Sequence, residues 1–186
     1  MNLPQNEARY FPEDASLNSK IVLYTGDITK LKVDCIVNAA HPGLTGGGGV
    51  DGFIHEKAGT DLIKACETLG GCDFGEAKLT KGYQLPAKYI IHVVGPSRNK
   101  RNPSILKLCY TNSLVLASQN NFKSIAFPCI STGNYEFDPI LACEIAVKSV
   151  REWLEQNKQT TIQTVIFCCF TVRDEIIYEE ILPNYF

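Results

Sequence analysis

Short apolar runs alternate along the chain with longer segments in which apolar positions recur at helical spacing. The short runs are rich in β-branched residues and predict strands. They cover residues 20–25, 33–40, 78–83, 89–94, 124–130 and 164–170. The longer segments predict helices. They cover residues 51–58, 60–69, 104–120, 139–156 and 175–181. This alternation predicts an α/β sandwich with a largely parallel or mixed sheet.

A run of four glycines follows the second predicted strand. Gly46, Gly47, Gly48 and Gly49 precede a helix expected to begin near Val50. Residues without a Cβ let the backbone approach a ligand closely, and free N–H groups at the start of a helix attract anions. The loop therefore predicts a phosphate site, with a flexible connection as the alternative. The sequence contains neither the Walker lysine pattern nor GxGxxG with its acidic ribose contact.

Two further turns follow predicted strands. Residues 131–135, STGNY, form a second turn of small residues after the strand at 124–130, and Asp27 opens a turn after the first strand. In open α/β sheets, ligands bind beyond the carboxyl ends of the strands, where both small-residue turns are expected. Asp27 is a candidate ligand contact, and the alternative is that it caps a short helix.

Length and composition indicate one globular domain. The chain has 186 residues, of which 45% are hydrophobic and 20% charged, with a net charge of −2. This charge gives no general attraction to nucleic acid or to an anionic membrane, so we expect neither as a partner. Residues 1–14 lack the apolar core of a signal peptide, and no apolar run reaches the ~20 residues needed to span a bilayer. We expect a soluble monomer inside the cell, in the cytoplasm or nucleus.

The eight cysteines do not form a metal-binding or disulfide pattern. Most lie inside apolar runs such as DCIV and IFCCF, where cysteine behaves as a small hydrophobic residue. No CxxC pair occurs, and His41, His55 and His92 are far apart in the sequence. We therefore expect reduced thiols, no metal and no cofactor.

Five motifs in the same order resemble the macrodomains, and among them the MacroD-type class. These are GDIT, VDCIVNAA, GGGGVDGFIHEKAG, GEAKLTKGYQLPAKYIIHVVGP and SIAFPCISTGNY. The resemblance covers residues 20–182, and it implies a three-layer α/β/α sandwich with a mixed, largely parallel central sheet. It also implies a macrodomain over residues 19–186. The preceding residues 1–18 are largely polar and contain Pro4 and Pro12, so we expect a loosely ordered arm there. The opening LNSKIVLYTGDIT and the closing ILPNYF are similar to the macrodomain of ganglioside-induced differentiation-associated proteins.

Macrodomains bind ADP-ribose, so the resemblance implies a role for each matching residue. Asp27 would accept a hydrogen bond from the adenine amino group, with the Ile28 backbone beside it. Phe170 would lie against adenine, and its alternative is one more core aromatic. The loop nearer the terminal ribose would consist of Gly46, Gly47, Gly48, Gly49 and Val50. The second phosphate loop would consist of Ser131, Thr132, Gly133, Asn134 and Tyr135, with Tyr135 covering the distal ribose.

The hydrolytic macrodomains remove ADP-ribose from acidic side chains without a metal. The resemblance assigns Asp51 as the residue that activates or orients water at the anomeric carbon. Its alternative is an acid in the first turn that complements the helix dipole. Asn38 would form a hydrogen bond within the ribose pocket.

The family pattern NAAN reads NAAH here, with His41 in place of the second asparagine. Binding could survive this change with impaired catalysis, or His41 could itself act as a base. Glu136 is a lesser departure, because many relatives have glycine after the loop tyrosine.

We expect a metal-independent ADP-ribosyl hydrolase that acts on ADP-ribosylated acidic side chains or on O-acetyl-ADP-ribose. The alternatives are a catalytically weak or inactive reader of ADP-ribosylated proteins and an interaction domain whose pocket has decayed.

Overall fold

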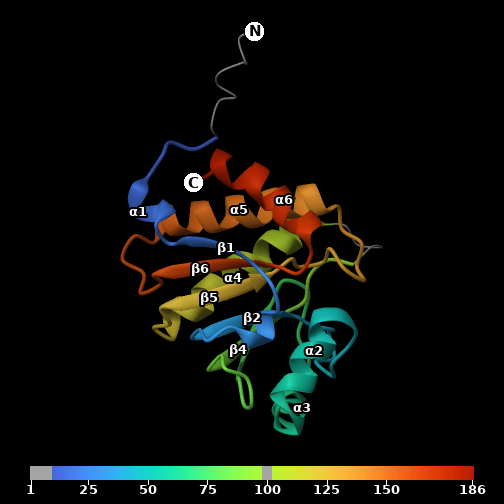
Figure 1. Ribbon diagram of the computed structural model, residues 1–186. Coiled ribbons are helices and arrows are strands. Elements are labelled where there is room, and N and C mark those ends of the chain that lie inside the picture. The colour runs from blue at the N-terminus through green and yellow to red at the C-terminus, as the bar shows by residue number, and fades with distance from the viewer. Residues whose placement is uncertain (1–9, 98–101) are drawn as a thin grey trace.

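The computed structural model describes residues 10–97 and 102–186, which form a six-stranded sheet in the order β1-β6-β5-β2-β4-β3 (Figure 1). The strands are β1 (Ile21–Thr25), β2 (Cys35–Ala39), β3 (Ala77–Lys81), β4 (Tyr89–Val93), β5 (Ser124–Pro128) and β6 (Thr164–Cys169). All neighbouring strands are parallel except β3, which runs antiparallel to β4 at the edge. The predicted mixed, largely parallel sheet is confirmed.

Helices cover both faces of this sheet. They are α1 (Ala15–Asn18), α2 (Gly49–Ala58), α3 (Thr60–Glu67), α4 (Pro103–Gln119), α5 (Pro139–Gln156) and α6 (Val172–Ile181). Side chains alternate between the two faces of a strand. Thus Val37 joins the core beneath α4, α5 and α6, whereas Ile36 joins the core beneath α2 and α3. Figure 1 shows α2 and α3 apart from α5 and α6. The three-layer α/β/α sandwich is confirmed.

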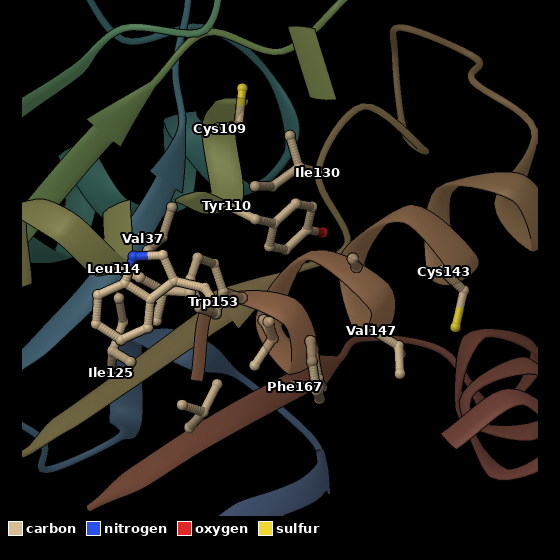
Figure 2. Close-up of a cluster of buried hydrophobic side chains, with 14 of the residues drawn as sticks. Val37, Cys109, Tyr110, Leu114, Ile125, Ile130, Cys143, Val147, Trp153 and Phe167 are labelled. Carbon is tan, nitrogen blue, oxygen red and sulfur yellow. The ribbon is translucent and has the colours of Figure 1, made fainter. Parts of the chain in front are cut away.

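The larger core packs against β5 and β6 (Figure 2). Tyr110 of α4 packs on Phe127 of β5, with ring centroids 5.0 Å apart, and Phe167 of β6 packs on Tyr178 of α6 at 5.2 Å. Burial of each large apolar side chain contributes about 1.5–3 kcal/mol. The ends of β5 and β6 are therefore held by a close-packed layer. No helix in the described ranges is long and apolar enough to cross a membrane.

Tyr10 and Phe11 of the expected arm contact the C-terminal end of the chain, α1 packs on α5, and residues 1–9 lie outside the described residues. Asp14 caps α1, whose Leu17 is buried. The ring of Tyr10 is 5.3 Å from that of Tyr185. The buried Arg151 of α5 donates hydrogen bonds to the carbonyls of Pro12 and Tyr185, so one guanidinium joins both ends of the described chain.

Element boundaries differ from the sequence predictions by at most three residues, and α5 matches at both ends. Helix α6 begins at Val172 instead of residue 175, because the Thr171 hydroxyl accepts from the Asp174 N–H and caps the first turn. Strand β2 begins at Cys35 instead of residue 33. The preceding Asp34 instead accepts hydrogen bonds from the N–H groups of Lys123 and Ser124 at the start of β5.

Candidate functional site

A cleft of about 790 Å³ lies beyond the carboxyl ends of the parallel strands. Four of these strands, β1, β6, β5 and β2, are consecutive in the sheet, so the segments that follow them lie in a row. This volume is within the usual range for a small-molecule site. The predicted ligand-binding and catalytic residues that line the cleft are Asp27, Ile28, His41, Gly47, Gly48, Gly49, Val50, Asp51, Ser131, Thr132, Gly133, Asn134, Tyr135 and Phe170.

Asp27 and Phe170 form one end of the cleft because β1 and β6 are paired. Asp27 caps the 3-10 helix η1 (Ile28–Lys30), and its Oδ1 accepts from the backbone N–H and the hydroxyl of Thr29 at 2.9 and 2.6 Å. The hydrogen bond from the Thr29 hydroxyl is the main cause that lowers the pKa of the Asp27 carboxyl. Capping and lining the cleft are therefore compatible roles for this carboxylate. Phe170 is 73% exposed and is not a core aromatic.

The glycine loop faces the second loop across the cleft. Gly46 and Gly49 have positive φ, at +74° and +61°, which a Cβ would disfavour. At Gly48 the backbone approaches the Asn134 side chain closely, since an added Cβ would lie 2.9 Å from Nδ2 of Asn134. Helix α2 begins at Gly49 with no side-chain cap, so its first N–H groups remain available to an anion.

The second loop holds a strained backbone and a buried hydroxyl. Ser131 and Glu136 have positive φ, at +67° and +48°, which is uncommon for residues with a Cβ. The Ser131 Oγ is buried without a hydrogen-bond partner among the described residues. Sequence reasoning missed Gly95 next to it, where an added Cβ would lie 2.2 Å from this Oγ. Ser131 thus brings an unsatisfied polar atom to the lining of the cleft.

Asp51 lies where the two loops meet. Its side chain is almost fully buried, and α2 places it in the first turn. Oδ1 accepts a 2.8 Å hydrogen bond from Nδ2 of Asn38, and Oδ2 accepts from the backbone N–H of His41 at 3.3 Å. Burial raises the pKa of the Tyr135 phenol, and the charge of Asp51 adds to this effect, so the phenol remains a hydrogen-bond donor. These two hydrogen bonds fix the orientation of the Asp51 carboxylate, which also lines the cleft.

The structure differs from the prediction at Asn38, which is fully buried and does not line the cleft formed by the described residues. Its Nδ2 also lies 3.1 Å from Nδ1 of His92, and Nε2 of His92 lies 2.9 Å from the Thr80 hydroxyl. Burial lowers the pKa of His92 to about 3. The ring is therefore neutral and accepts from Asn38 at Nδ1, which leaves its proton on Nε2. Asn38 therefore holds Asp51 through Nδ2, while its Oδ1 is buried without a hydrogen-bond partner among the described residues.

His41 contacts Asp51 through its backbone N–H, and its exposed side chain lines the cleft. Nδ1 accepts a 3.1 Å hydrogen bond from the backbone N–H of Gly43. A neutral ring with an accepting Nδ1 carries its proton on Nε2 and has no free acceptor. In this conformation Nε2 of His41 is a hydrogen-bond donor at the lining of the cleft.

The macro domain family matches residues 37–146 of the chain. The chain belongs to the macro domain family. This macro domain is 50% identical over 180 residues to "ADP-ribose glycohydrolase MACROD1" of Mus musculus, across 95% of the chain and 55% of the relative. It is 49% identical over 175 residues to "ADP-ribose glycohydrolase MACROD2" of Homo sapiens, across 92% of the chain and 41% of that relative. The chain therefore spans about half the length of these curated relatives.

A solved structure agrees with the fold of the macro domain. The crystal structure of a Trypanosoma brucei macrodomain in complex with ADP-ribose matches with a TM-score of 0.85 and 44% identity. The match covers 91% of this chain and 72% of that one. The predicted macrodomain fold and the MacroD-type resemblance are confirmed.

Sequence reasoning missed a second histidine beside Asp51 in the macro domain. His55 follows one helical turn later, and its Nε2 lies 3.5 Å from Oδ1 of Asp51. The spacing of four residues on a predicted helix was the available signal. Gly46 lies behind the cleft against this ring, since an added Cβ would be 3.1 Å from Cγ of His55.

The described residues of the macro domain contain no group of three or more His, Cys, Asp or Glu side chains that could hold a metal ion. All eight cysteines are free, and all but Cys129 are buried. Burial raises the pKa of Cys66 to about 11 and that of Cys72 to about 12, so these thiols are protonated at neutral pH. The polar side chains that line the cleft are carboxylates, hydroxyls, the Tyr135 phenol, the Asn134 amide, the His41 imidazole and the Arg173 guanidinium.

Proposed function

We propose that the cleft binds ADP-ribose and that Asp51 catalyses its hydrolytic release from acidic side chains or from O-acetyl-ADP-ribose. The observation that carries this proposal is the buried Asp51 carboxylate, held by Asn38 and the His41 backbone at the junction of the two loops. Relatives named ADP-ribose glycohydrolases and a relative solved with ADP-ribose support the same substrate.

The chemistry of the cleft fits each part of the ligand. The diphosphate lies between the uncapped start of α2 and the second loop, where backbone N–H groups, the helix dipole and the Ser131 hydroxyl can stabilise its charge. Adenine lies at the end formed by Asp27 and Phe170, where the ionised carboxylate accepts from the exocyclic amino group. The distal ribose then lies next to Asp51 and Tyr135, which line the same cleft.

Hydrolysis then requires a positioned water molecule. Asp51 accepts a proton from water, the water oxygen bonds to the anomeric carbon, and the bond from that carbon to the acyl oxygen breaks. The acidic side chain, or acetate, leaves as a carboxylate. A buried carboxylate fixed by two hydrogen bonds suits this role, because its orientation is set before the substrate binds. No step requires a metal ion.

The alternative is a reader module that binds ADP-ribosylated proteins without turnover. The replacement of asparagine by His41 favours it, but Asp51 is contacted by the backbone of this residue, and that contact survives the replacement. We therefore place the hydrolase first. The ligands of the reader would be the same, so binding alone does not separate the two functions.

Calorimetric titration of the purified protein tests the ligand. We expect ADP-ribose to bind at about micromolar affinity, near −8 kcal/mol. Asp27→Ala should weaken ADP-ribose more than ribose 5-phosphate, because the partner of Asp27 is adenine. Asp27→Asn removes the negative charge but keeps the helix cap, because the asparagine side chain can still accept the hydrogen bond from the Thr29 N–H. Asp61→Ala removes an exposed carboxylate on α3 as the matched control.

Absence of binding at millimolar ADP-ribose would refute the proposal. Equal losses for both ligands in Asp27→Ala would show that the residue only holds the turn.

A further inference from the structure

Phe53 is an exposed aromatic side chain that no part of the proposed mechanism uses. It lies on α2 and is 53% exposed, although its neighbour Ile54 is fully buried. Phe53 also lines the cleft together with Asp27 and Phe170. A large apolar ring exposed within a ligand cleft loses its contact with water when an apolar ligand surface covers it.

The neighbours of α2 place Phe53 at the Asp27 end of the cleft. Helix α2 packs against η1, which Asp27 caps. Residues four apart share one face of a helix, so Phe53 and Lys57 lie on the same face. Phe53, Ile28 of η1 and Asp27 line the same cleft, in agreement with this packing.

Phe170 reaches the same end of the cleft from a different element. It follows β6, whose Cys168 belongs to the core on the α2 side of the sheet and also lines the cleft. Because side chains alternate along a strand, Phe170 is expected on the same face as Cys168. Asp27 follows the neighbouring strand β1. Two aromatic rings, one on α2 and one after β6, therefore line the cleft together with Asp27.

We propose that Phe53 is a base-stacking residue, so that the purine ring of ADP-ribose is held between Phe53 and Phe170. This inference rests on the proposed function and extends it to the nucleoside end of the ligand. Asp27 distinguishes adenine by its amino group, whereas the two rings bind the face of the base. Stacking on an aromatic ring tolerates different bases, because every base has a π-face.

Three ligands separate stacking from the other contacts. ADP-ribose has the whole base, IDP-ribose replaces the amino group with a carbonyl, and ribose 5-phosphate has no base. Phe53→Ala should weaken ADP-ribose and IDP-ribose by the same factor, about tenfold by analogy with stacked bases. It should leave ribose 5-phosphate unchanged. In the release assay it should raise KM with little change in kcat, because Phe53, although only two residues after Asp51 on α2, points away from it around the helix and contacts the base instead of the reacting bond.

Matched variants control for structure. Phe53→Tyr keeps the aromatic face and should retain binding, whereas Phe53→Leu keeps apolar bulk, loses the π-face and should bind ADP-ribose more weakly. Ile63→Ala truncates another exposed apolar side chain on the adjoining helix α3, outside the cleft lining. Alanine has the highest helix propensity, so Phe53→Ala should keep α2 folded. If the thermal unfolding midpoint of Phe53→Ala nevertheless falls, the ADP-ribose affinity of Phe53→Leu tests the inference instead.

Two results would overturn the inference while leaving the proposed function intact. One is normal ADP-ribose affinity in Phe53→Ala, and the other is an equal loss for ribose 5-phosphate. A wild-type protein that does not bind ADP-ribose would refute the proposed function and this inference together.

Discussion

Mildly acidic pH should destabilise the fold, because the buried His92 resists protonation while the histidine of the unfolded chain binds a proton. Burial holds its pKa at about 3 in the folded protein, whereas an unfolded histidine titrates near about 6.5. The unfolded chain therefore binds a proton that the folded chain does not. The contribution of His92 to the free energy of unfolding is complete above about pH 6.5 and is lost as the pH falls toward about 3. Between about pH 7.5 and pH 5, this linkage removes about 2 kcal/mol from the free energy of unfolding.

The variant His92→Gln isolates this effect. Glutamine can accept from Asn38 and donate to Thr80, the two partners of the histidine ring, but it does not titrate. Urea unfolding followed by the fluorescence of Trp153 measures both proteins. With an m-value of about 2 kcal/mol/M, the wild-type midpoint should fall by roughly 1 M more than that of the variant over the same pH interval. His41 and His55 remain in both proteins, so their contributions cancel. Equal pH dependence of the two midpoints would refute the reasoning.

Three further outcomes follow from the contacts around Asp51 and the buried thiols. Asn38→Ala removes the donor to Oδ1 of Asp51 and should lower kcat by about tenfold with little change in KM, measured in the release assay. His41→Asn keeps the backbone contact to Asp51 and should raise the release rate, whereas a lower rate would identify the imidazole as the base. Cys66 and Cys72, whose pKa values are raised, should react with iodoacetamide far more slowly in the folded than in the unfolded protein, as mass spectrometry would report.

The sequence was sufficient for the elements of the fold but not for their order in the sheet. Period-two and helical spacing are local properties, so strands such as β5 and helices such as α5 could be predicted from them. The pairing of β2 with β5 joins segments about 90 residues apart, and no local pattern encodes it. That pairing is what brings the glycine loop and the second loop to one edge of the sheet.

Side-chain direction explains what was missed at the candidate site. The resemblance gave Asn38 a ribose contact, but a side chain pointing inward from β2 meets Asp51 and His92 instead. The roles considered for His41 depended on its ring, whereas its backbone makes the contact to Asp51. Phe53 carried no sequence signal, because an apolar residue next to a buried position on a helix resembles one more core residue.

Release of ADP-ribose from a glutamate-linked, auto-modified protein tests the central claim most directly. The wild-type protein should release ADP-ribose in the presence of EDTA, because the reaction uses Asp51 and no metal. Asp51→Ala should abolish release while retaining ADP-ribose binding by calorimetry, since the loops that hold the diphosphate are unchanged. Release that continues at the wild-type rate in Asp51→Ala would contradict the account.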